Sequence, residues 1–469
     1  MKMIRLTGIA FIGALATTVN AQSYKVLVNF NDVPAVPESG IIAQSRGGYL
    51  LTTADDFGND PGVAFRVTTS GVLTVLHQFG TTDGAAPSGG LTLSRNGRFY
   101  GTTEAGGNHG LGTIFEMTPD GVVKTLHEFA GGADGGSPTA PPIQSLYGDF
   151  YGTTFAAPGV EGTPGVQGTV YKVTSDGNFS PLHAFTGPDG DLPFGPMVQA
   201  TNYWFYGTTG AGGTHGAGTI FRISSRGEFE VLFNFDGMHG AAPYAGLIQA
   251  NDGEFYGVTV NGGAHDSGVV FRMTPTHQVT VLHDFTGGAD GSGPLGGLVQ
   301  ASDGYLYGTT EQGGAFGEGV LFRISTTGNL TVLHDFQQST GNDPQNTLIQ
   351  HTNGFLYGET VSGGSYGNGV FFRFDLGLPP FVTYLPGYGR VGMTVDILGQ
   401  YFTPDSEVYF NGVPAQITRV EPTFMRVVVP VGAASGPITV TTTKGTLKSN
   451  RVFLVRSRTK ARAIKSRTS

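Results

Sequence analysis

Three histidines occupy equivalent places in a phrase that the sequence repeats, Y-G-T-T followed by a glycine-rich stretch. They are His109, His215 and His265, and later copies of the phrase carry Phe316 and Tyr366 at the same place. Neutral imidazoles are common metal ligands, so three histidines on one surface could bind a metal ion. The exchange with phenylalanine and tyrosine favours a different role, in which flat rings pack over their loops or stack on a ligand.

Glutamates stand close to the same phrase. Glu104 and Glu311 directly follow Y-G-T-T, and Glu359 lies two places earlier in its copy. Two carboxyl groups that face one opening could hydrolyse a glycosidic bond. No nucleophile elbow, zinc-protease motif or P-loop accompanies them, so the sequence predicts no catalytic residue.

Aspartates recur in the connections between copies, at Asp83, Asp134, Asp189, Asp290 and Asp343. An aspartate followed by glycine and proline is typical of a turn in which its side chain bonds backbone N–H groups. The alternative is calcium binding through carboxylate oxygens. The stretch PDGDLP, with Asp189 and Asp191, is the best calcium candidate, and it lacks the spacing of an EF-hand loop. Calcium is the one cofactor for which the sequence offers a candidate site.

Another set of histidines stands in the phrase L-H-x-F: His77, His127, His183, His283 and His334. In a strand, each of these shares a face with the phenylalanine two residues later. Catalysis does not need five copies of one base. We therefore expect these histidines to be packed and hydrogen-bonded between sheets.

All these residues belong to a repeat of about 50 residues, anchored at Tyr49, Tyr100, Tyr151, Tyr206, Tyr256, Tyr307 and Tyr357. One copy, 294–336, contains four β-prone segments, in which short turns alternate with long glycine-rich loops. Four antiparallel strands with this alternation make a propeller blade. The repeats therefore predict an all-β fold with a seven-bladed β-propeller over 22–376. The alternative is a solenoid, which would need polar capping repeats that the sequence lacks.

The two ends of the repeat region complement each other. Segment 24–30 resembles a fourth strand, whereas the last copy stops after its third strand near 374. Pairing of the two would close the propeller and remove its open edges. The alternation of loops also places every long loop on one face, where binding residues are usually found.

The N-terminal residues 1–21 have the pattern of a signal peptide, with Lys2 and Arg5 before an apolar stretch. The absence of cysteine excludes disulfides and thiol chemistry. Net charge is −9, while residues 456–469 are basic, so the remainder is distinctly acidic and nucleic acid is not an expected partner. We expect no transmembrane segment in the mature chain, a disordered basic tail, and a monomer that is secreted or associated with the cell envelope.

The repeat of about 50 residues stops before Pro379, and a different sequence pattern begins there. The phrases GMTVDILGQYF (392–402), VYFNGVPA (408–415) and VVVPVGAASGPITV (427–440) resemble an IPT/TIG domain. This resemblance implies an immunoglobulin-like β-sandwich over 379–455, of a kind that serves as a spacer or binding module. The repeats, with their YGTT, GG, GTIF and LHxF phrases, resemble the GloVer tandem-repeat family of exported bacterial proteins. That resemblance implies architecture and export, and no particular activity.

These features favour an exported, non-enzymatic binding protein. Its long-loop face would bind an extracellular polysaccharide or a surface protein. One alternative is a propeller enzyme, a polysaccharide hydrolase or lyase with acidic rim residues as catalysts. The other is a structural scaffold that presents the IPT/TIG domain.

Overall fold

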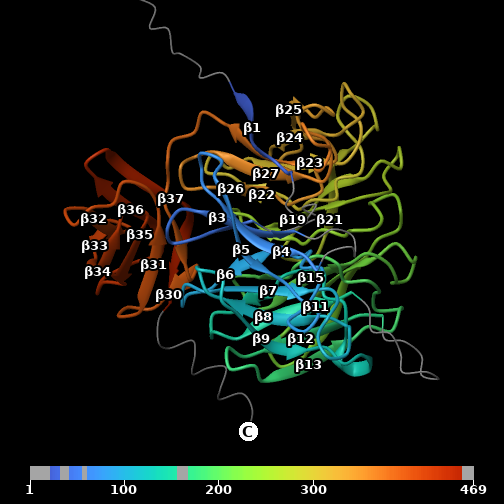
Figure 1. Cartoon of the computed structure of the whole chain (residues 1–469), viewed down its shortest axis with the longest axis horizontal. Coiled ribbons are helices and arrows are strands. Elements are labelled where there is room, and N and C mark those ends of the chain that lie inside the picture. Colours follow the sequence, from blue (N-terminus) through green and yellow to red (C-terminus); the bar gives the residue numbers. More distant parts are fainter. Residues whose placement is uncertain (1–21, 32–41, 55–60, 156–166, 457–469) are drawn as a thin grey trace, which may run out of the picture.

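The computed structural model describes residues 22–31, 42–54, 61–155 and 167–456. The predicted signal peptide and all but the first residue of the predicted tail lie outside these ranges. The described residues contain no α-helix, and their strands form seven four-stranded sheets followed by a two-sheet module (Figure 1). The inner ends of successive sheets meet around one central opening, as blades do. The predicted classes, a β-propeller followed by a β-sandwich, are confirmed. No helix in the described ranges has the length and hydropathy needed to cross a membrane.

The strands of each blade follow one another from the centre outward. Blades one to three contain β2 (Ala43–Gln44), β3 (Leu50–Ala54), β4 (Val63–Val67), β5 (Leu73–Gln78); β6 (Leu91–Leu93), β7 (Phe99–Thr103), β8 (Thr113–Met117), β9 (Val123–Glu128); β10 (Ile143–Gln144), β11 (Phe150–Thr154), β12 (Thr169–Val173), β13 (Phe179–Ala184). Blades four and five contain β14 (Val198–Gln199), β15 (Phe205–Thr209), β16 (Thr219–Ile223), β17 (Phe229–Asn234); β18 (Ile248–Gln249), β19 (Phe255–Thr259), β20 (Val269–Met273), β21 (Val279–Asp284). Blades six and seven contain β22 (Val299–Gln300), β23 (Leu306–Thr310), β24 (Val320–Ile324), β25 (Leu330–Asp335); β26 (Ile349–Gln350), β27 (Leu356–Thr360), β28 (Val370–Asp375).

Blade seven takes its outer strand from the start of the chain. β1 (Ser23–Asn29) pairs antiparallel with β28, and Tyr24 lies opposite Phe374. The ring of Tyr24 stacks on His334 of blade six with centroids 4.0 Å apart, and its hydroxyl donates to the carbonyl of Thr340 at 2.9 Å. The N-terminal strand therefore completes one blade and contacts its neighbour.

The recurring Y-G-T-T phrase forms the second strand of a blade, and this strand is buried along its whole length. Its glycine makes room for an aromatic side chain of the third strand. A Cβ at Gly207 would lie 2.5 Å from Cζ of Phe221, and one at Gly152 would lie 2.3 Å from the hydroxyl of Tyr171. Such distances are shorter than packed atoms allow. Six blades share this close packing, whereas blade one has Thr52 opposite Phe65 at the same position.

Glutamines at the ends of the first strands join neighbouring blades. Gln199 of blade four accepts the backbone N–H of Leu146 in blade three at 3.0 Å, and donates to the carbonyl of Tyr203 in its own turn at 3.3 Å. The equivalent acceptors elsewhere are Gln44, Gln144, Gln249, Gln300 and Gln350. Blade two differs, because Leu93 stands at this place. Each glutamine satisfies a backbone donor that would otherwise lack a partner between blades.

The module after the propeller is a sandwich of two sheets. One sheet has the order β29 (Thr383–Leu385), β31 (Thr394–Leu398), β35 (Phe424–Val428), β34 (Gln416–Glu421). The other has the order β30 (Tyr388–Gly389), β37 (Gly445–Val455), β36 (Gly436–Thr442), β32 (Glu407–Phe410), β33 (Val413–Pro414). Alternating residues of both sheets, among them Ile397, Phe410 and Phe453, form its buried core.

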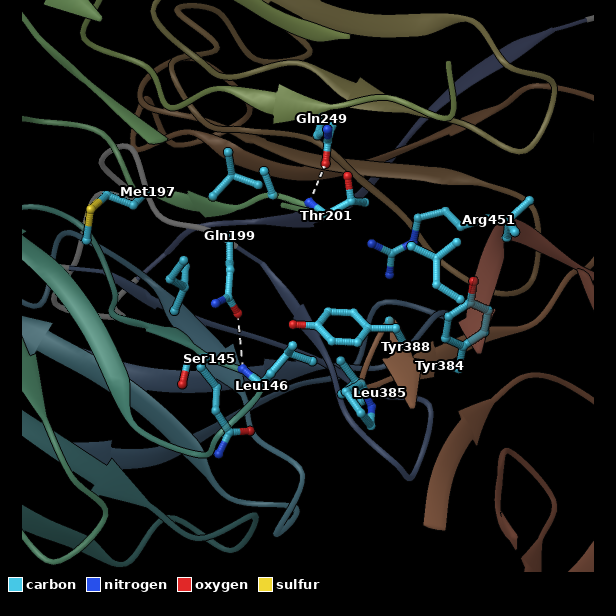
Figure 2. Close-up of a pocket in the computed structure, with 18 of the residues that line it drawn as sticks. Ser145, Leu146, Met197, Gln199, Thr201, Gln249, Tyr384, Leu385, Tyr388 and Arg451 are labelled. Carbon is cyan, nitrogen blue, oxygen red and sulfur yellow. Dashed lines mark hydrogen bonds between the residues drawn. The ribbon is translucent and has the colours of Figure 1, made fainter. Parts of the chain in front are cut away.

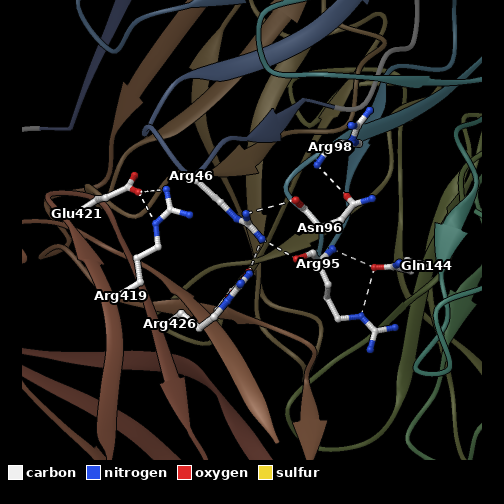
Figure 3. A network of polar contacts seen from close by, with 9 residues as sticks. Arg46, Arg95, Asn96, Arg98, Gln144, Arg419, Glu421 and Arg426 are labelled. Carbon is white, nitrogen blue, oxygen red and sulfur yellow. Dashed lines mark hydrogen bonds and ion pairs between the residues drawn. The ribbon is translucent and has the colours of Figure 1, made fainter. Parts of the chain in front are cut away.

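The sandwich is docked on the short-turn face of the propeller, which carries the turns between first and second strands. Arg46, in the turn of blade one, forms an ion pair with Asp396 of the sandwich, which also accepts Nε of Arg426 at 2.6 Å. The same Arg46 side chain donates to the carbonyl of Arg95 in blade two at 2.5 Å (Figure 3). Arg46 thus links blades one and two at the joint where the glutamine is missing, and fastens the sandwich there.

Other docking contacts lie on both sides of the central opening. Beside Arg46, the carbonyl of Thr352 in blade seven accepts the backbone N–H of Phe381 at 3.0 Å. On the opposite side, Arg456 donates to the carbonyl of Thr201 in blade four at 2.7 Å. Asn251 of blade five donates to the carbonyl of Asn450 at 2.9 Å. In a propeller of seven sheets, blades seven and one stand across from blades four and five. The sandwich therefore spans the short-turn face.

Candidate functional site

The opposite, long-loop face carries the loops between second and third strands and the connections between blades. Its described loops contain no lysine or arginine, whereas they contain Asp83, Glu104, Asp134, Asp189, Asp191, Asp236, Asp266, Asp290, Glu311, Glu318 and Asp343. The sandwich does not contact this face through any of the docking bonds described above. The long-loop face is therefore open and uniformly negative, which disfavours anionic ligands.

The five residues that the sequence predicts as a rim are exposed on this face. His109, His215 and His265 are exposed, and Phe316 and Tyr366 each retain 58% of their accessible surface. Each ring belongs to a different blade, and those of blades four to seven follow one another around the propeller. All five rings are therefore accessible to solvent.

The outermost strand of each blade fixes the position of the ring. The backbone N–H before Phe316, that of Ala315, donates to Asp335 at 2.7 Å, and the N–H of Ser365 donates to Asn29 at 2.8 Å. The same bond joins Asn108 to Glu128, Thr214 to Asn234 and Ala264 to Asp284. Because the acceptor is always the last residue of the outer strand, the rings stand at the outer rim. Within the described residues, no three histidine or acidic side chains converge as metal ligands would.

Glu104 and Glu311 lie closer to the centre than these rings. Their backbone N–H groups bond the preceding connection between blades, at Ala86 (2.8 Å) and Gly293 (3.1 Å). Burial raises the pKa of both carboxyl groups, and the negative charge of Asp343 raises that of Glu311 further. Glu104 and Glu311 belong to blades two and six, so the structure does not bring these two together.

Asp343 is a neighbour of Glu311 and lies, as predicted, in a connection between blades. It does not correspond to Asp83, because it has a positive φ of 59° and stands directly before the proline, as Ala86 and Leu192 do. Burial raises its pKa, and the charge of Glu318 adds to this effect. The loop sequence QQSTGNDP differs from the other connections, so matching its aspartate to Asp83 misaligns the loop. Aligning the prolines instead places Asp343 with Ala86 and Leu192.

Asp189 forms the turn that its sequence predicts. Its carboxylate forms a hydrogen bond with Nε2 of His183 at 2.9 Å. It also accepts hydrogen bonds from the backbone N–H and the hydroxyl of Thr186, at 2.8 and 2.9 Å. Burial alone would raise the pKa of Asp189, but these bonds hold it below its ordinary value. Asp191 is separate from this network, and burial raises its pKa. Both oxygens of Asp189 therefore accept hydrogen bonds within this turn.

The histidines of the L-H-x-F phrase are packed, as expected. His127 and His183 stack on Phe179 and Phe229 of the next blade, with centroids 3.8 and 3.7 Å apart. His77, His127, His183 and His283 also bond the turn aspartates, namely Asp83, Asp134, Asp189 and Asp290. His334 is packed against Tyr24, but its Nε2 has no hydrogen-bond partner among the described residues. His127, His183 and His334 therefore join neighbouring blades.

The central opening is narrow at the long-loop end. A Cβ on Gly195 would lie 2.4 Å from the backbone nitrogen of Gly246, so neighbouring blades meet there backbone to backbone. The cavity that remains between their inner ends measures about 30 Å³. That is the share of one water molecule in the liquid. A larger ligand would have to lie across the face.

Solved structures resemble this chain in fold. A fungal alcohol oxidase of the AA5 family, in complex with copper, has a TM-score of 0.51 at 13% identity, and the match covers 91% of this chain and 98% of that chain. The periplasmic gluconolactonase of Pseudomonas aeruginosa has a TM-score of 0.45 at 16% identity, over 70% and 98% of the two chains. A gluconolactonase of Xanthomonas campestris has a TM-score of 0.39 at 13% identity, over 73% and 97%. The match to the oxidase shows a likeness of fold and carries no activity across.

Family models account for most of the chain. A search of curated proteins gives no match. The model of the IPT/TIG domain matches residues 381–454, in agreement with the sandwich. The model of the Gloeobacter/Verrucomicrobia repeat matches residues 36–252 and 224–384, which together comprise more than half of the sequence. The chain therefore belongs to the Gloeobacter/Verrucomicrobia repeat family and ends in an IPT/TIG domain.

Proposed function

We propose that this protein is an exported binding protein whose long-loop face holds an uncharged polysaccharide. The observation that carries the proposal is the composition of the described part of that face: exposed rings on five blades, many carboxylates, and neither lysine nor arginine. Aromatic rings stack on the apolar faces of sugars, and carboxylates accept hydrogen bonds from hydroxyl groups. A face with only negative charges repels uronate-rich or sulfated chains.

The spacing of the rings favours a polymer over a single sugar. Each ring stands at the outer rim of its own blade, and the opening between the blades has space for about 30 Å³. A ligand that contacts several rings must therefore extend along the face, where many weak contacts add up.

The test compares neutral and acidic oligosaccharides of equal length by isothermal titration calorimetry. We expect saturable binding of a neutral chain and at least tenfold weaker binding of its uronate counterpart. The double variant Phe316→Ala/Tyr366→Ala should weaken binding tenfold or more, since loss of a stacking ring costs about 1 kcal/mol at each site. Tyr147→Ala is the matched control, because Tyr147 is 76% exposed on the short-turn face.

Two results would change the proposal. Equal binding of neutral and acidic chains would remove the argument from charge. The second result is that no oligosaccharide binds but a basic protein does, and that Phe316→Ala/Tyr366→Ala abolishes its binding. The ligand of this face would then be a protein and not a polysaccharide.

A hydrolytic activity is the second candidate. It is favoured by Glu311 and Asp343, two carboxyl groups from different blades whose pKa values are raised by burial and, for Glu311, by the charge of Asp343. A raised pKa brings a carboxyl group closer to the range in which it can act as a general acid. Glu311→Gln should then abolish turnover of a bound oligosaccharide while leaving its affinity within about twofold. Unchanged turnover in this variant would reject the pair as catalysts.

A further inference from the structure

A cavity of about 500 Å³ lies between the short-turn face of the propeller and the docked sandwich (Figure 2). Its propeller wall comes from the inner strands and turns of blades two to five, and its other wall from the sandwich segments 384–388 and 451–454. The volume lies in the range of cavities that bind small molecules. The long-loop face and its rings contribute nothing to this cavity, so the two sites are independent.

The charges that line the cavity have one sign. In the described residues, Arg95 and Arg451 are its only charged lining residues. Arg95 donates to side-chain and backbone oxygens at Gln144, Ser145 and Leu146, none of which is a carboxylate. A third guanidinium, that of Arg456, lies 5.3 Å from the ring centre of Tyr388. These positive charges have no carboxylate beside them in the cavity, although the protein as a whole is acidic.

Tyr388 supplies an unused hydrogen-bonding group. Its hydroxyl is buried and has no hydrogen-bond partner among the described residues. Figure 2 shows this hydroxyl pointing from the sandwich toward Leu146 and Gln199 of the propeller wall. A buried hydroxyl without a partner costs free energy, which a bound acceptor would recover. Burial raises the pKa of Tyr388, so the hydroxyl remains a donor.

The rest of the lining is mostly apolar. Ile143, Leu146, Met197 and Val198 line the propeller side, and Leu385 and Leu454 line the sandwich side. An ion such as phosphate would leave these surfaces uncovered. A ligand with one charged end and an apolar body would cover them and gain from their desolvation.

The docking contacts hold both walls in place. Arg46 and Thr352 fasten the sandwich on one side of the propeller, and Arg456 and Asn251 fasten it on the other. The cavity lies between these fixed points, so it exists before a ligand arrives. A preformed cavity avoids the cost of ordering its walls on binding.

We propose that this cavity binds a small organic anion, a carboxylate on an apolar or aromatic body. The carboxylate accepts from the Tyr388 hydroxyl and faces the guanidinium groups of Arg95 and Arg451, while the apolar body lies against the inner strands of blades three and four. The sandwich therefore completes a binding site that the propeller alone does not form.

The probe is 1-naphthylacetate, titrated into the full chain by calorimetry, with 1-naphthylacetamide as its uncharged counterpart. We expect one site per chain for the acid and at least tenfold weaker binding of the amide. Tyr388→Phe should weaken binding of the acid about tenfold, the loss of one hydrogen bond to a charged group. Because this hydroxyl has no partner in the free protein, the same variant should keep the wild-type melting temperature or raise it. Arg451→Gln should also weaken binding about tenfold.

Tyr171→Phe is the matched control, since the hydroxyl of Tyr171 is likewise buried without a partner but lies in the core of blade three. It should bind the acid as the wild type does, and so should Phe316→Ala/Tyr366→Ala. The proposal is overturned if the acid does not bind, if the acid and the amide bind equally, or if Tyr388→Phe binds as Tyr171→Phe does. Inorganic phosphate that binds as tightly as the naphthyl acid would overturn the role of the apolar wall.

Discussion

Glu359 stands where the equivalent second strand of blade six has Thr309, and it is completely buried. Its carboxyl accepts Nδ2 of Asn346 at 2.8 Å, and burial raises its pKa to about 8. In the unfolded chain this carboxyl ionises near pH 4.3. Between these values the folded state binds one more proton than the unfolded state. The contribution of Glu359 to stability is therefore fully present below about pH 4 and is lost as pH rises through about 8.

Glu359→Gln should remove this loss, because glutamine keeps the acceptor for Asn346 and cannot ionise. We expect the variant at pH 8 to exceed the wild type in free energy of unfolding by at least about 1.4 kcal/mol, the equivalent of one pKa unit. At pH 4 the two should be nearly equal. Chemical denaturation at both values checks this, with the exposed Glu228→Gln as control. Parallel stability profiles of Glu359→Gln and wild type between pH 4 and pH 8 would contradict it.

Single residues differ in how far sequence alone reveals them. The strand period put the histidine of each L-H-x-F phrase on the face of a buried phenylalanine, and His127 and His183 do pack between blades. The position of Glu359 in its strand was also readable, but its burial depends on the neighbouring blade connection that supplies Asn346. The cavity around Tyr388 was not predictable, because Arg95 and Arg451 come from domains whose docking no local pattern encodes.

At the scale of the elements, the glutamines of the first strands hold the blades together. Gln300 accepts the N–H of Asn251 in blade five at 2.9 Å and donates to the carbonyl of Gly304 at 3.0 Å. Gln300→Leu keeps the size of the side chain and leaves both backbone groups unpaired. We expect a loss of about 1–3 kcal/mol in free energy of unfolding. Gln278→Leu, at an exposed turn position with no side-chain bond, should change it by no more than about 0.5 kcal/mol. Equal stabilities of the two variants would show that the glutamines are dispensable.

The elements were the most predictable level of this protein. A period of about 50 residues with short turns and long loops specifies four-stranded units, and the buried Y-G-T-T strand fits it. The first strands are shorter than their apolar sequences suggest. The segment GLVQA (297–301) looks like a strand of five residues, but β22 contains only Val299–Gln300. These strands have a partner on one side only, because their inner edge borders the central opening. Their glutamines look like ordinary strand residues in the sequence, and only the register of neighbouring turns reveals the bonds.

The whole molecule depends on how firmly the sandwich is docked, which the sequence did not indicate. Arg46 is the central contact, because it bonds blade two and the buried carboxylate of Asp396 at once. Arg46→Met keeps the apolar part of the side chain and removes both interactions. Asp396 retains Arg426, so the sandwich keeps its own ion pair. The variant therefore weakens docking and removes one bond between blades one and two, while the sandwich keeps its internal ion pair.

Two domains unfold together only while their interface contributes enough free energy to couple them. We expect the wild-type chain to unfold in one calorimetric transition, and Arg46→Met to show a separate, earlier transition for one domain. Arg419→Met is the matched control, since Arg419 pairs with Glu421 at the surface, with 59% and 39% of the side chains exposed, and such pairs contribute little. A single transition in Arg46→Met at the wild-type temperature would mean that the remaining contacts at Thr352, Asn251 and Arg456 suffice. If Arg46→Met shows a second transition, the variant also distinguishes the two binding sites. Binding of naphthylacetate should then be weaker because docking is weaker, while a ligand of the long-loop face should bind as before.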